Sequence, residues 1–168
     1  MEITQEYVRQ VFNYKDGDLF WNIKPNTRVR IGDKAGSQDA KGYLYLSLNH
    51  KKYPVHHIVF LYFNGYLPKM IDHIDNVKNN NKIENLREAT YSQNNRNVLL
   101  RKDNKSGIKN VFFEKWTKKW KVMLRIDGKR KCFGRYSDVE LAELVAIEAR
   151  NKYHGEYANH GNKNEVSR

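Results

Sequence analysis

Residues 108–136 constrain the fold most, because they alternate apolar and polar side chains between tight-turn signals. One face of the central stretch carries the apolar side chains Trp120, Val122, Leu124 and Ile126. Alternation with a period of two is typical of a half-buried β-strand. Asp127-Gly128 predicts a two-residue hairpin turn, and Thr117-Lys118 predicts the turn before the central strand. The segment is therefore expected to form three antiparallel strands.

A helix is expected directly after these strands, from about residue 138 to residue 153. Ser137 and Glu140 have the spacing of a capping box, in which the two side chains satisfy free backbone N–H groups. Small apolar residues then recur at helical spacing, at Ala142, Val145, Ala146 and Ala149. Such a stripe would pack on one face of the sheet and complete a small α+β module.

The positive charge of the chain is concentrated in the strand region. The chain has 168 residues and a net charge of +12, and residues 101–136 hold 13 basic and 3 acidic residues. Residues 1–100 hold 14 basic and 10 acidic residues, and residues 137–168 hold 4 and 6. A basic sheet face predicts binding to a polyanion such as nucleic acid, and the alternative is a solubilising surface.

Other features exclude several classes of protein. No apolar run approaches the roughly 18 residues of a membrane span, and the N-terminus lacks the basic and apolar pattern of a secretory signal. Cys132 is the only cysteine, which excludes an internal disulfide and a cysteine zinc cluster. We therefore expect a cytoplasmic protein that is not secreted and contacts no membrane. No obligate protein partner is visible in the sequence, and a monomer or a dimer on DNA is expected.

The first hundred residues are expected to form a separate α/β part. A helix pattern at residues 3–12 precedes the turn signal Asp16-Gly17. Residues 42–57 have a hairpin pattern, and the apolar run at residues 55–68, stopped by Gly65 and Pro68, predicts a short buried helix.

The domain boundaries follow from a polar and basic stretch at residues 101–107, which predicts a linker. We expect a first domain at residues 1–100, a second at residues 108–161 and a tail at residues 162–168.

Residues 70–97, MIDHIDNVKNNNKIENLREATYSQNNRN, form a stretch too polar to be core. Asp72 and His73 follow two apolar residues, where a short strand is expected to end. Carboxylate and amide oxygens are hard ligands that favour Mg²⁺ or Mn²⁺ over zinc, and an imidazole suits a general base near neutral pH. Together with a basic face for phosphates, these groups suggest phosphodiester hydrolysis. The alternative is a polar turn in which Asp72 is a cap and His73 lies on the surface.

The segment around this stretch resembles the HNH endonucleases found in phages and among homing enzymes. The resemblance spans residues 55–95 and rests on His56, Asp72-His73, Asn79-Asn80-Asn81, Asn85-Leu86-Arg87, Ala89-Thr90 and Asn94-Asn95. It implies a ββα-metal nuclease module. The expected fold class is therefore α+β, with this module followed by a three-stranded antiparallel sheet packed on one helix.

The same resemblance implies roles for individual residues. His73 resembles the general base, and Asn85 resembles the middle Asn that orients the loop and the base by hydrogen bonds. Asp72 and Asn94 would hold one divalent cation, Mg²⁺ or Mn²⁺. Many relatives have His at the position of Asn94, and this departure further favours a hard metal over zinc. Asn95 is an alternative ligand, because the helix register is uncertain by one residue.

His56 matches the His that precedes the Asp-His pair in the family. The resemblance implies a catalytic role for it, and the alternative is a buried histidine that supports the loop.

Residues 106–161 share with another family a Gly-x-x-x-Val start, the Lys119-Trp120 pair, Gly134 and the sequence NKYHGEYA. They resemble the plant Apetala/ethylene-response-factor DNA-binding domain, which also occurs beside HNH modules in phage proteins. In that family the three-stranded sheet lies in the major groove of duplex DNA. Several Arg and Trp positions of the family are replaced here, at Phe112, Glu114, Met123 and Cys132. The binding mode would then carry over without the sequence preference.

Seven residues are expected to contact DNA. On the sheet module these are Lys109, Trp116, Lys121, Arg125 and Arg130, and in the first domain they are Arg87 and Arg96. Arg125 and Arg130 are the strongest candidates for base or phosphate contacts.

The sequence thus predicts a metal-dependent, site-selective DNA endonuclease of a phage or mobile element, acting on double-stranded DNA in the host cytoplasm. One active site would nick one strand, and a double-strand break would need a dimer or two events. The alternative is a non-catalytic, sequence-specific DNA-binding regulator with a degenerate nuclease fold. A third interpretation is an RNA-binding module.

Overall fold

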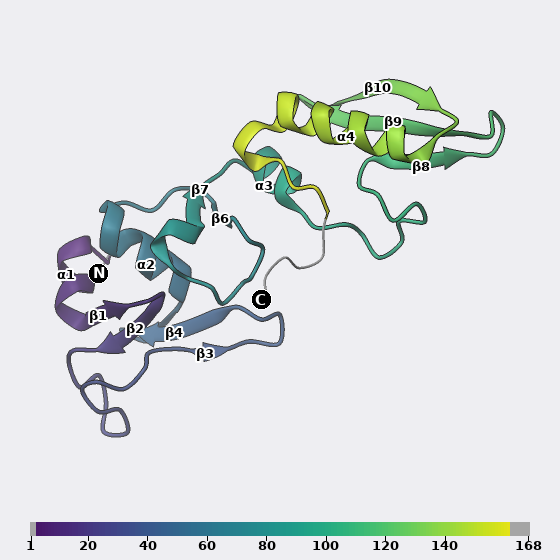
Figure 1. Ribbon diagram of the computed structural model, residues 1–168. Helices are drawn as coiled ribbons and strands as arrows, with labels where there is room; N and C mark the ends of the chain where they lie inside the picture. The colour runs from purple at the N-terminus through teal and green to yellow at the C-terminus, as the bar shows by residue number, and fades with distance from the viewer. Residues whose placement is uncertain (1–2, 162–168) are drawn as a thin grey trace. The chain divides into compact units, whose positions relative to one another are not determined.

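The computed structural model describes residues 3–161, and contacts within the chain divide it into two compact units, residues 1–90 and 91–168 (Figure 1). The division falls earlier than the predicted boundary at residue 100, so the predicted linker at 101–107 belongs to the second unit. The predicted tail at 162–168 lies outside the described residues. Among the described residues, no helix has the length and apolar character needed to cross a membrane.

The first unit is a mixed α+β structure with small antiparallel sheets. Its helices are α1 (Gln5–Val11) and α2 (Val55–Asn64), with a 3₁₀ turn η1 (Ile83–Asn85). Its strands are β1 (Phe12–Lys15), β2 (Asp18–Trp21), β3 (Ser37–Gln38), β4 (Leu44–Leu48), β5 (Lys51–Pro54), β6 (Ile71–His73) and β7 (Leu86–Glu88). The strands pair as β1-β2, β3-β4-β5 and β6-β7.

The core of the first unit lies where α1 and α2 meet the strands. Its fully buried side chains include Val8, Phe12, Leu19, Ile58 and Val59. The predicted helices and the predicted hairpin within residues 42–57 are confirmed as α1, α2 and β4-β5. α2 ends at Gly65, which has the left-handed conformation (φ 79°) that ends many helices.

The β1-β2 hairpin supports the polar loop after β6. Gly17 has φ +91°, and a Cβ atom there would lie 2.8 Å from the backbone N of Lys82. The hydroxyl of Tyr14 accepts a hydrogen bond from the N–H of Ile83 at 3.1 Å. The turn and the loop therefore touch backbone to backbone, which only glycine allows at position 17.

The second unit contains a three-stranded antiparallel sheet covered on one face by a helix. Its elements are α3 (Tyr91–Asn97), β8 (Val111–Glu114), β9 (Lys119–Ile126), β10 (Lys129–Tyr136), α4 (Val139–His154) and the 3₁₀ turn η2 (Gly155–Tyr157). The strand order is β10-β9-β8, and α4 packs along β9 and β10 (Figure 1). The three predicted strands and the turn at Asp127-Gly128, where both residues have positive φ, are confirmed.

The predicted stripe of small residues on α4 is also confirmed. Ala142, Ala146 and Ala149 are buried against Val122 and Leu124 of β9. The predicted capping by Ser137 is wrong.

The cap of α4 is Asp138, whose side chain accepts hydrogen bonds from the N–H groups of Glu140 and Leu141. Asp caps helices as well as Ser does, and it directly precedes the first helical residue here.

Candidate active site

β6 and β7 place the Asp-His pair at the centre of the candidate site. In the antiparallel register Asp72 lies opposite Arg87, and His73 lies opposite Leu86. Both side chains are buried, with Asp72 4% and His73 7% exposed. Neighbouring residues on a strand point to opposite faces, so the carboxylate and the imidazole have different surroundings.

The carboxylate of Asp72 is paired with Arg87. Its Oδ2 accepts hydrogen bonds from Nε and Nη2 of Arg87 at 3.0 and 2.8 Å, and both side chains are shielded from solvent. A buried carboxylate requires such a counter-charge, because an isolated buried charge is strongly unfavourable. Arg87, which was predicted to contact DNA, therefore neutralises the predicted metal ligand in this structure.

The imidazole of His73 is held by Asn81. Nε2 of His73 lies 3.0 Å from Oδ1 of Asn81, and Asn81 is only 1% exposed. With the amide oxygen facing the ring, Nε2 of His73 is the donor of this contact, because an amide oxygen can only accept a hydrogen bond. This contact fixes the orientation of the imidazole. Asn81 was matched in the family pattern without a role of its own, and sequence spacing alone does not reveal its contact.

Asn85 organises the loop between β6 and β7. Its Nδ2 donates to Oδ1 of Asp75 at 2.9 Å and to the carbonyl of Asn80 at 2.8 Å. Its Oδ1 accepts from the N–H of Asp75 at 3.1 Å, and its backbone carbonyl accepts from the N–H of Ile74 at 2.9 Å. These bonds tie both ends of the loop together, so that Asn81 lies on a fixed backbone beside His73.

His56 lies on α2 against the imidazole of His73, with ring centroids 4.9 Å apart in an edge-to-face arrangement. Burial, with smaller contributions from His57 and His73, lowers the pKa of His56 to about 3, so the side chain is neutral at physiological pH. Within the described part of the chain, its Nδ1 is buried without a hydrogen-bond partner. This placement fits a neutral histidine packed against His73, and the catalytic role of His56 stays a prediction.

The donors present fit a magnesium or manganese ion better than zinc. In the described residues, no group of three or more His, Cys, Asp and Glu side chains is placed to hold a metal ion. Zinc sites need three or four such ligands. Magnesium is commonly held by one or two carboxylates, with waters and substrate phosphates as the other ligands, and Asp72 supplies one buried carboxylate.

The second predicted metal ligand lies on α3 in the second unit. Asn94 is half-buried there, and the alternative, Asn95, is exposed. The pairing of Asp72 with Asn94 stays a prediction.

The uncovered face of the second unit's sheet carries several of the predicted DNA contacts. Trp116, in the turn after β8, is 89% exposed. Arg125 and Arg130 are exposed register partners on β9 and β10, and Nε of Arg125 donates to the carbonyl of Gly128 at 3.1 Å. Lys121 also lies on this face, with Nζ 3.2 Å from Oε1 of Glu114.

Two other predicted DNA contacts have partners inside the second unit. Nζ of Lys109 donates to the backbone carbonyls of Arg96 and Val98, and burial together with the charge of Arg150 lowers the pKa of Lys109 to about 8. Nη2 of Arg96 lies 3.7 Å from Oδ1 of Asp127. Both residues stay predictions as DNA contacts.

Arg135, opposite Lys121 on the uncovered face of the sheet, was not predicted from the sequence. Its Nε and Nη2 lie 2.7 and 3.3 Å from Glu114, and hydrogen bonds from Arg135 and then Thr117 lower the pKa of Glu114 to about 2. An irregularity between Cys132 and Gly134 shifts the strand register. Strict alternation from Cys132 would have turned Arg135 toward the helix, so only the bulge reveals its position.

Comparison with known proteins gives two matches. Residues 53–96 match the HNH endonuclease family. Over 112 residues the chain is 35% identical to Protein 3.8 of Escherichia phage T7, and this match covers 64% of the chain and 90% of that protein. No solved structure matches the chain. The HNH match contains His56, Asp72, His73, Asn85 and Asn94, and it ends before the sheet of the second unit.

Proposed function

Because the chain belongs to the family of phage T7 Protein 3.8 and matches HNH endonucleases over residues 53–96, we propose that it is a metal-dependent, site-selective DNA endonuclease. The observation that carries this proposal is the pairing of buried His73 with buried Asn81 at 3.0 Å, next to buried Asp72. A turn that was polar only for solubility would have no reason to bury these three side chains.

His73 is the general base of the proposed reaction. Its Nδ1 would accept a proton from the water that attacks the scissile phosphorus, while Asn81 holds the proton on Nε2. Asn85 acts through the loop, because its hydrogen bonds fix the backbone that carries Asn81. Asn85 is therefore a positioning residue.

Asp72 and Asn94 would hold the divalent cation, which stabilises the negative charge that develops on the phosphate and the leaving oxygen. Arg87 neutralises Asp72 in the structure, and its guanidinium offers two N–H groups in the geometry that phosphate oxygens accept. With a cation on Asp72, Arg87 would bind a substrate phosphate. Asp72 would then act as the predicted metal ligand and Arg87 as the predicted DNA contact.

The second unit is proposed to hold duplex DNA through the uncovered face of its sheet. This face carries Lys121, Arg125 and Arg130, and Trp116 is exposed in the turn after β8, which suits the docking mode of the Apetala family. Phosphate contacts of this kind would make binding weaken steeply with salt.

The test is conversion of supercoiled plasmid to nicked circles with Mg²⁺ or Mn²⁺, using plasmid that carries the DNA flanking the protein's own gene. Wild type should nick, and EDTA should abolish nicking. His73→Ala should lose activity, and the matched control His50→Ala should keep it, because His50 is exposed at the β4-β5 turn. Full cleavage by His73→Ala would refute the assignment of the base.

The same assay distinguishes the regulator from the nuclease. A regulator would bind one duplex sequence tightly and leave it intact with Mn²⁺ present. That result on a plasmid carrying the bound sequence would replace the endonuclease proposal.

A further inference from the structure

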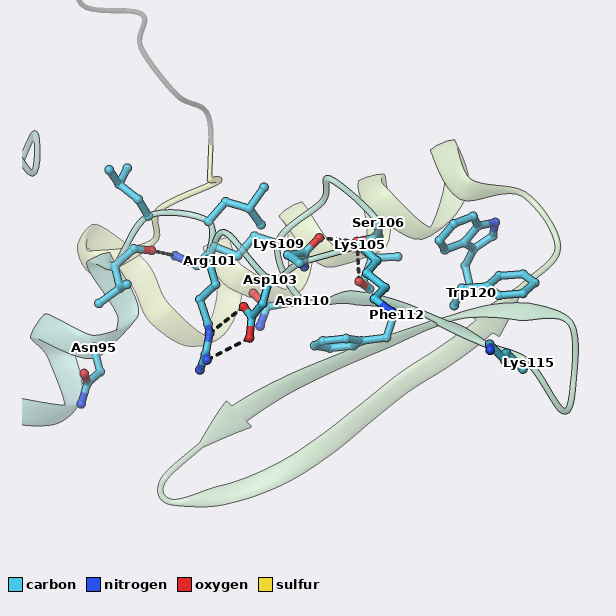
Figure 2. A pocket seen from close by; sticks show the side chains of 16 residues that line it. Asn95, Arg101, Asp103, Lys105, Ser106, Lys109, Asn110, Phe112, Lys115 and Trp120 are labelled. Carbon is cyan, nitrogen blue, oxygen red and sulfur yellow. Dashed lines mark hydrogen bonds and ion pairs between the residues drawn. The ribbon is translucent and has the colours of Figure 1, made fainter.

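The second unit has an apolar cavity beside β8, and among its lining residues only Asn95 and Lys109 have a role above. It has a volume of about 920 Å³ and lies between residues 98–106 and the edge of the sheet (Figure 2). We call it the β8 groove. Its size falls within the roughly 300–1,000 Å³ of typical ligand sites.

Exposed apolar side chains gather in the β8 groove. Val98 and Leu99 are 44% and 39% exposed on one wall, and Phe112 and Phe113 are 47% and 50% exposed on the strand. Phe113 packs against Trp120 with ring centroids 4.9 Å apart, and half of its surface still faces solvent. Phe113 points to the same side of the sheet as Trp120 and Phe112 to the opposite side with Lys121, so the exposed apolar surface runs around the edge of β8. Exposed apolar surface of this kind marks interaction sites.

The walls of the groove are held in place by hydrogen bonds. Oγ of Ser106 donates to the carbonyl of Val111 at 2.6 Å and accepts from the N–H of Ile108 at 3.2 Å. Nδ2 of Asn104 donates to the carbonyl of Ile108 at 3.2 Å. The loop is therefore anchored to the edge of β8, and the groove is formed before any ligand arrives.

The charge around the groove is positive. Its lining contains Arg101, Lys105, Lys109 and Lys115 against one carboxylate, Asp103, which pairs with Arg101 (Figure 2). An occupant that complements this lining has flat apolar groups for the aromatic rings and negative charge for the lysines. Unpaired nucleotides have both, whereas the bases of an intact duplex are stacked inside it and cannot reach the rings.

We propose that the β8 groove binds unpaired nucleotides of a DNA strand, with a base stacked on Phe113 and phosphates against Lys105 and Lys115. This inference deepens the proposed nuclease function and rests on it for the identity of the ligand as DNA. The second unit would then hold two forms of DNA, duplex on the uncovered sheet face and an unpaired stretch at the β8 edge. The preferred substrates would be duplexes that carry a single-stranded gap, flap or branch.

The test is fluorescence anisotropy with the full-length protein in EDTA, so that no DNA is cut. The probes are a labelled oligothymidylate and a labelled blunt duplex. Phe113→Ala should weaken oligothymidylate binding about 5- to 150-fold, which corresponds to the loss of one base stacked on an aromatic ring. Duplex binding should stay within about twofold of wild type.

Two further variants guard against misfolding. Phe113→Leu keeps the apolar contact with Trp120 but removes the flat ring, and it should weaken oligothymidylate binding in the same direction. Lys105→Ala should reduce the slope of log affinity against log salt by about 0.7 for the single strand. Lys102→Ala is its matched control, because Lys102 is exposed on the same loop and does not line the groove.

Three outcomes would overturn the inference: equal losses on duplex and single strand, equal effects of Lys102→Ala and Lys105→Ala, or unchanged single-strand binding by Phe113→Leu. Displacement of oligothymidylate by polyglutamate, in a manner that depends on Phe113, would instead assign the groove to an acidic peptide. Plasmid nicking keeps the two proposals separate. Nicking without Phe113-dependent single-strand binding would refute the groove assignment alone, and the reverse result would refute the nuclease proposal alone.

Discussion

Substituting Asn81 by Asp should shift the pH dependence of cleavage. Asn81 is 1% exposed, and its Oδ1 lies 3.0 Å from Nε2 of His73. A carboxylate at this position would place a negative charge against the imidazole with almost no solvent to screen it. Opposite charge at this distance favours the charged form, so His73 would hold its proton and lose its capacity to act as a base until the pH is higher.

The expected size of this shift follows from the burial of the pair. A charge partner within about 4–6 Å changes a titration midpoint by roughly 1–3 pH units, and direct contact at a buried position belongs to the upper part of that range. The acidic limb of the rate profile should therefore move upward by about 2 units. At a pH well below both midpoints, a shift of 2 units corresponds to a rate about 100-fold lower.

The assay is the initial rate of plasmid nicking with Mg²⁺ between pH 5.5 and 9.5. Asn79→Asp is the matched control, because it adds the same charge on the same loop at an exposed position. It should leave the midpoint almost unchanged, since water screens it. An unchanged midpoint in Asn81→Asp, with the variant folded, would refute the view that Asn81 holds the catalytic base.

Three other predictions follow from the structure. Gly17→Ala should lower the free energy of unfolding by about 1–3 kcal/mol, because φ is +91° there and a Cβ would lie 2.8 Å from the backbone N of Lys82. Urea denaturation measures this change, and a variant as stable as wild type would contradict the close approach of turn and loop. The pKa of His56 is lowered to about 3 in the folded protein, so between this pH and about 6.5 the unfolded chain binds one more proton at this side chain than the folded chain does. The free energy of unfolding should therefore fall as the pH drops below about 6.5, by roughly 2 kcal/mol at pH 5. His56→Gln should show a correspondingly flatter dependence in metal-free buffer, and an equal slope would refute the neutral state. Glu114→Gln should free Arg135 for phosphates and steepen the salt dependence of duplex binding by about 0.9 per new contact, whereas an unchanged slope would show that this face does not meet DNA.

Local patterns in the sequence were sufficient to predict the secondary structure near the site. An apolar run predicted the helix at α2, and apolar periodicity predicted the strands of the second unit. The turn at Asp127-Gly128 followed from the intrinsic backbone preferences of these two residues. The end of a short strand at Asp72-His73 was predicted in the same way and is confirmed as β6. These features depend on neighbours in the sequence.

Contacts between side chains that are distant in the sequence could not be predicted from such local patterns. The sequence contains eleven residues from Asn76 to Leu86 with five asparagines among them, and nothing in that order shows that Asn81 meets His73 while Asn85 ties the loop. The bulge that brings Arg135 to Glu114 is similarly invisible, because it breaks the alternation from which faces are inferred. In both cases the side chain's partner is set by backbone geometry that composition does not encode.

The pairing of Asp72 with Arg87 explains how the first unit can bury the charge of its predicted metal ligand. The antiparallel register of β6 and β7 places the two residues opposite each other, so the pairing of the strands itself brings the arginine to the carboxylate. A cation on Asp72 and a phosphate on Arg87 would replace one set of opposite charges by another, and neither side chain would be left buried and unpaired. Removing the arginine leaves the carboxylate without this counter-charge. Arg87→Ala should therefore destabilise the fold when no metal is added, and Mn²⁺ should restore more stability to this variant than to wild type, as thermal unfolding would show. Equal stabilisation of wild type and Arg87→Ala by Mn²⁺ would show that the cation does not bind Asp72 in place of Arg87.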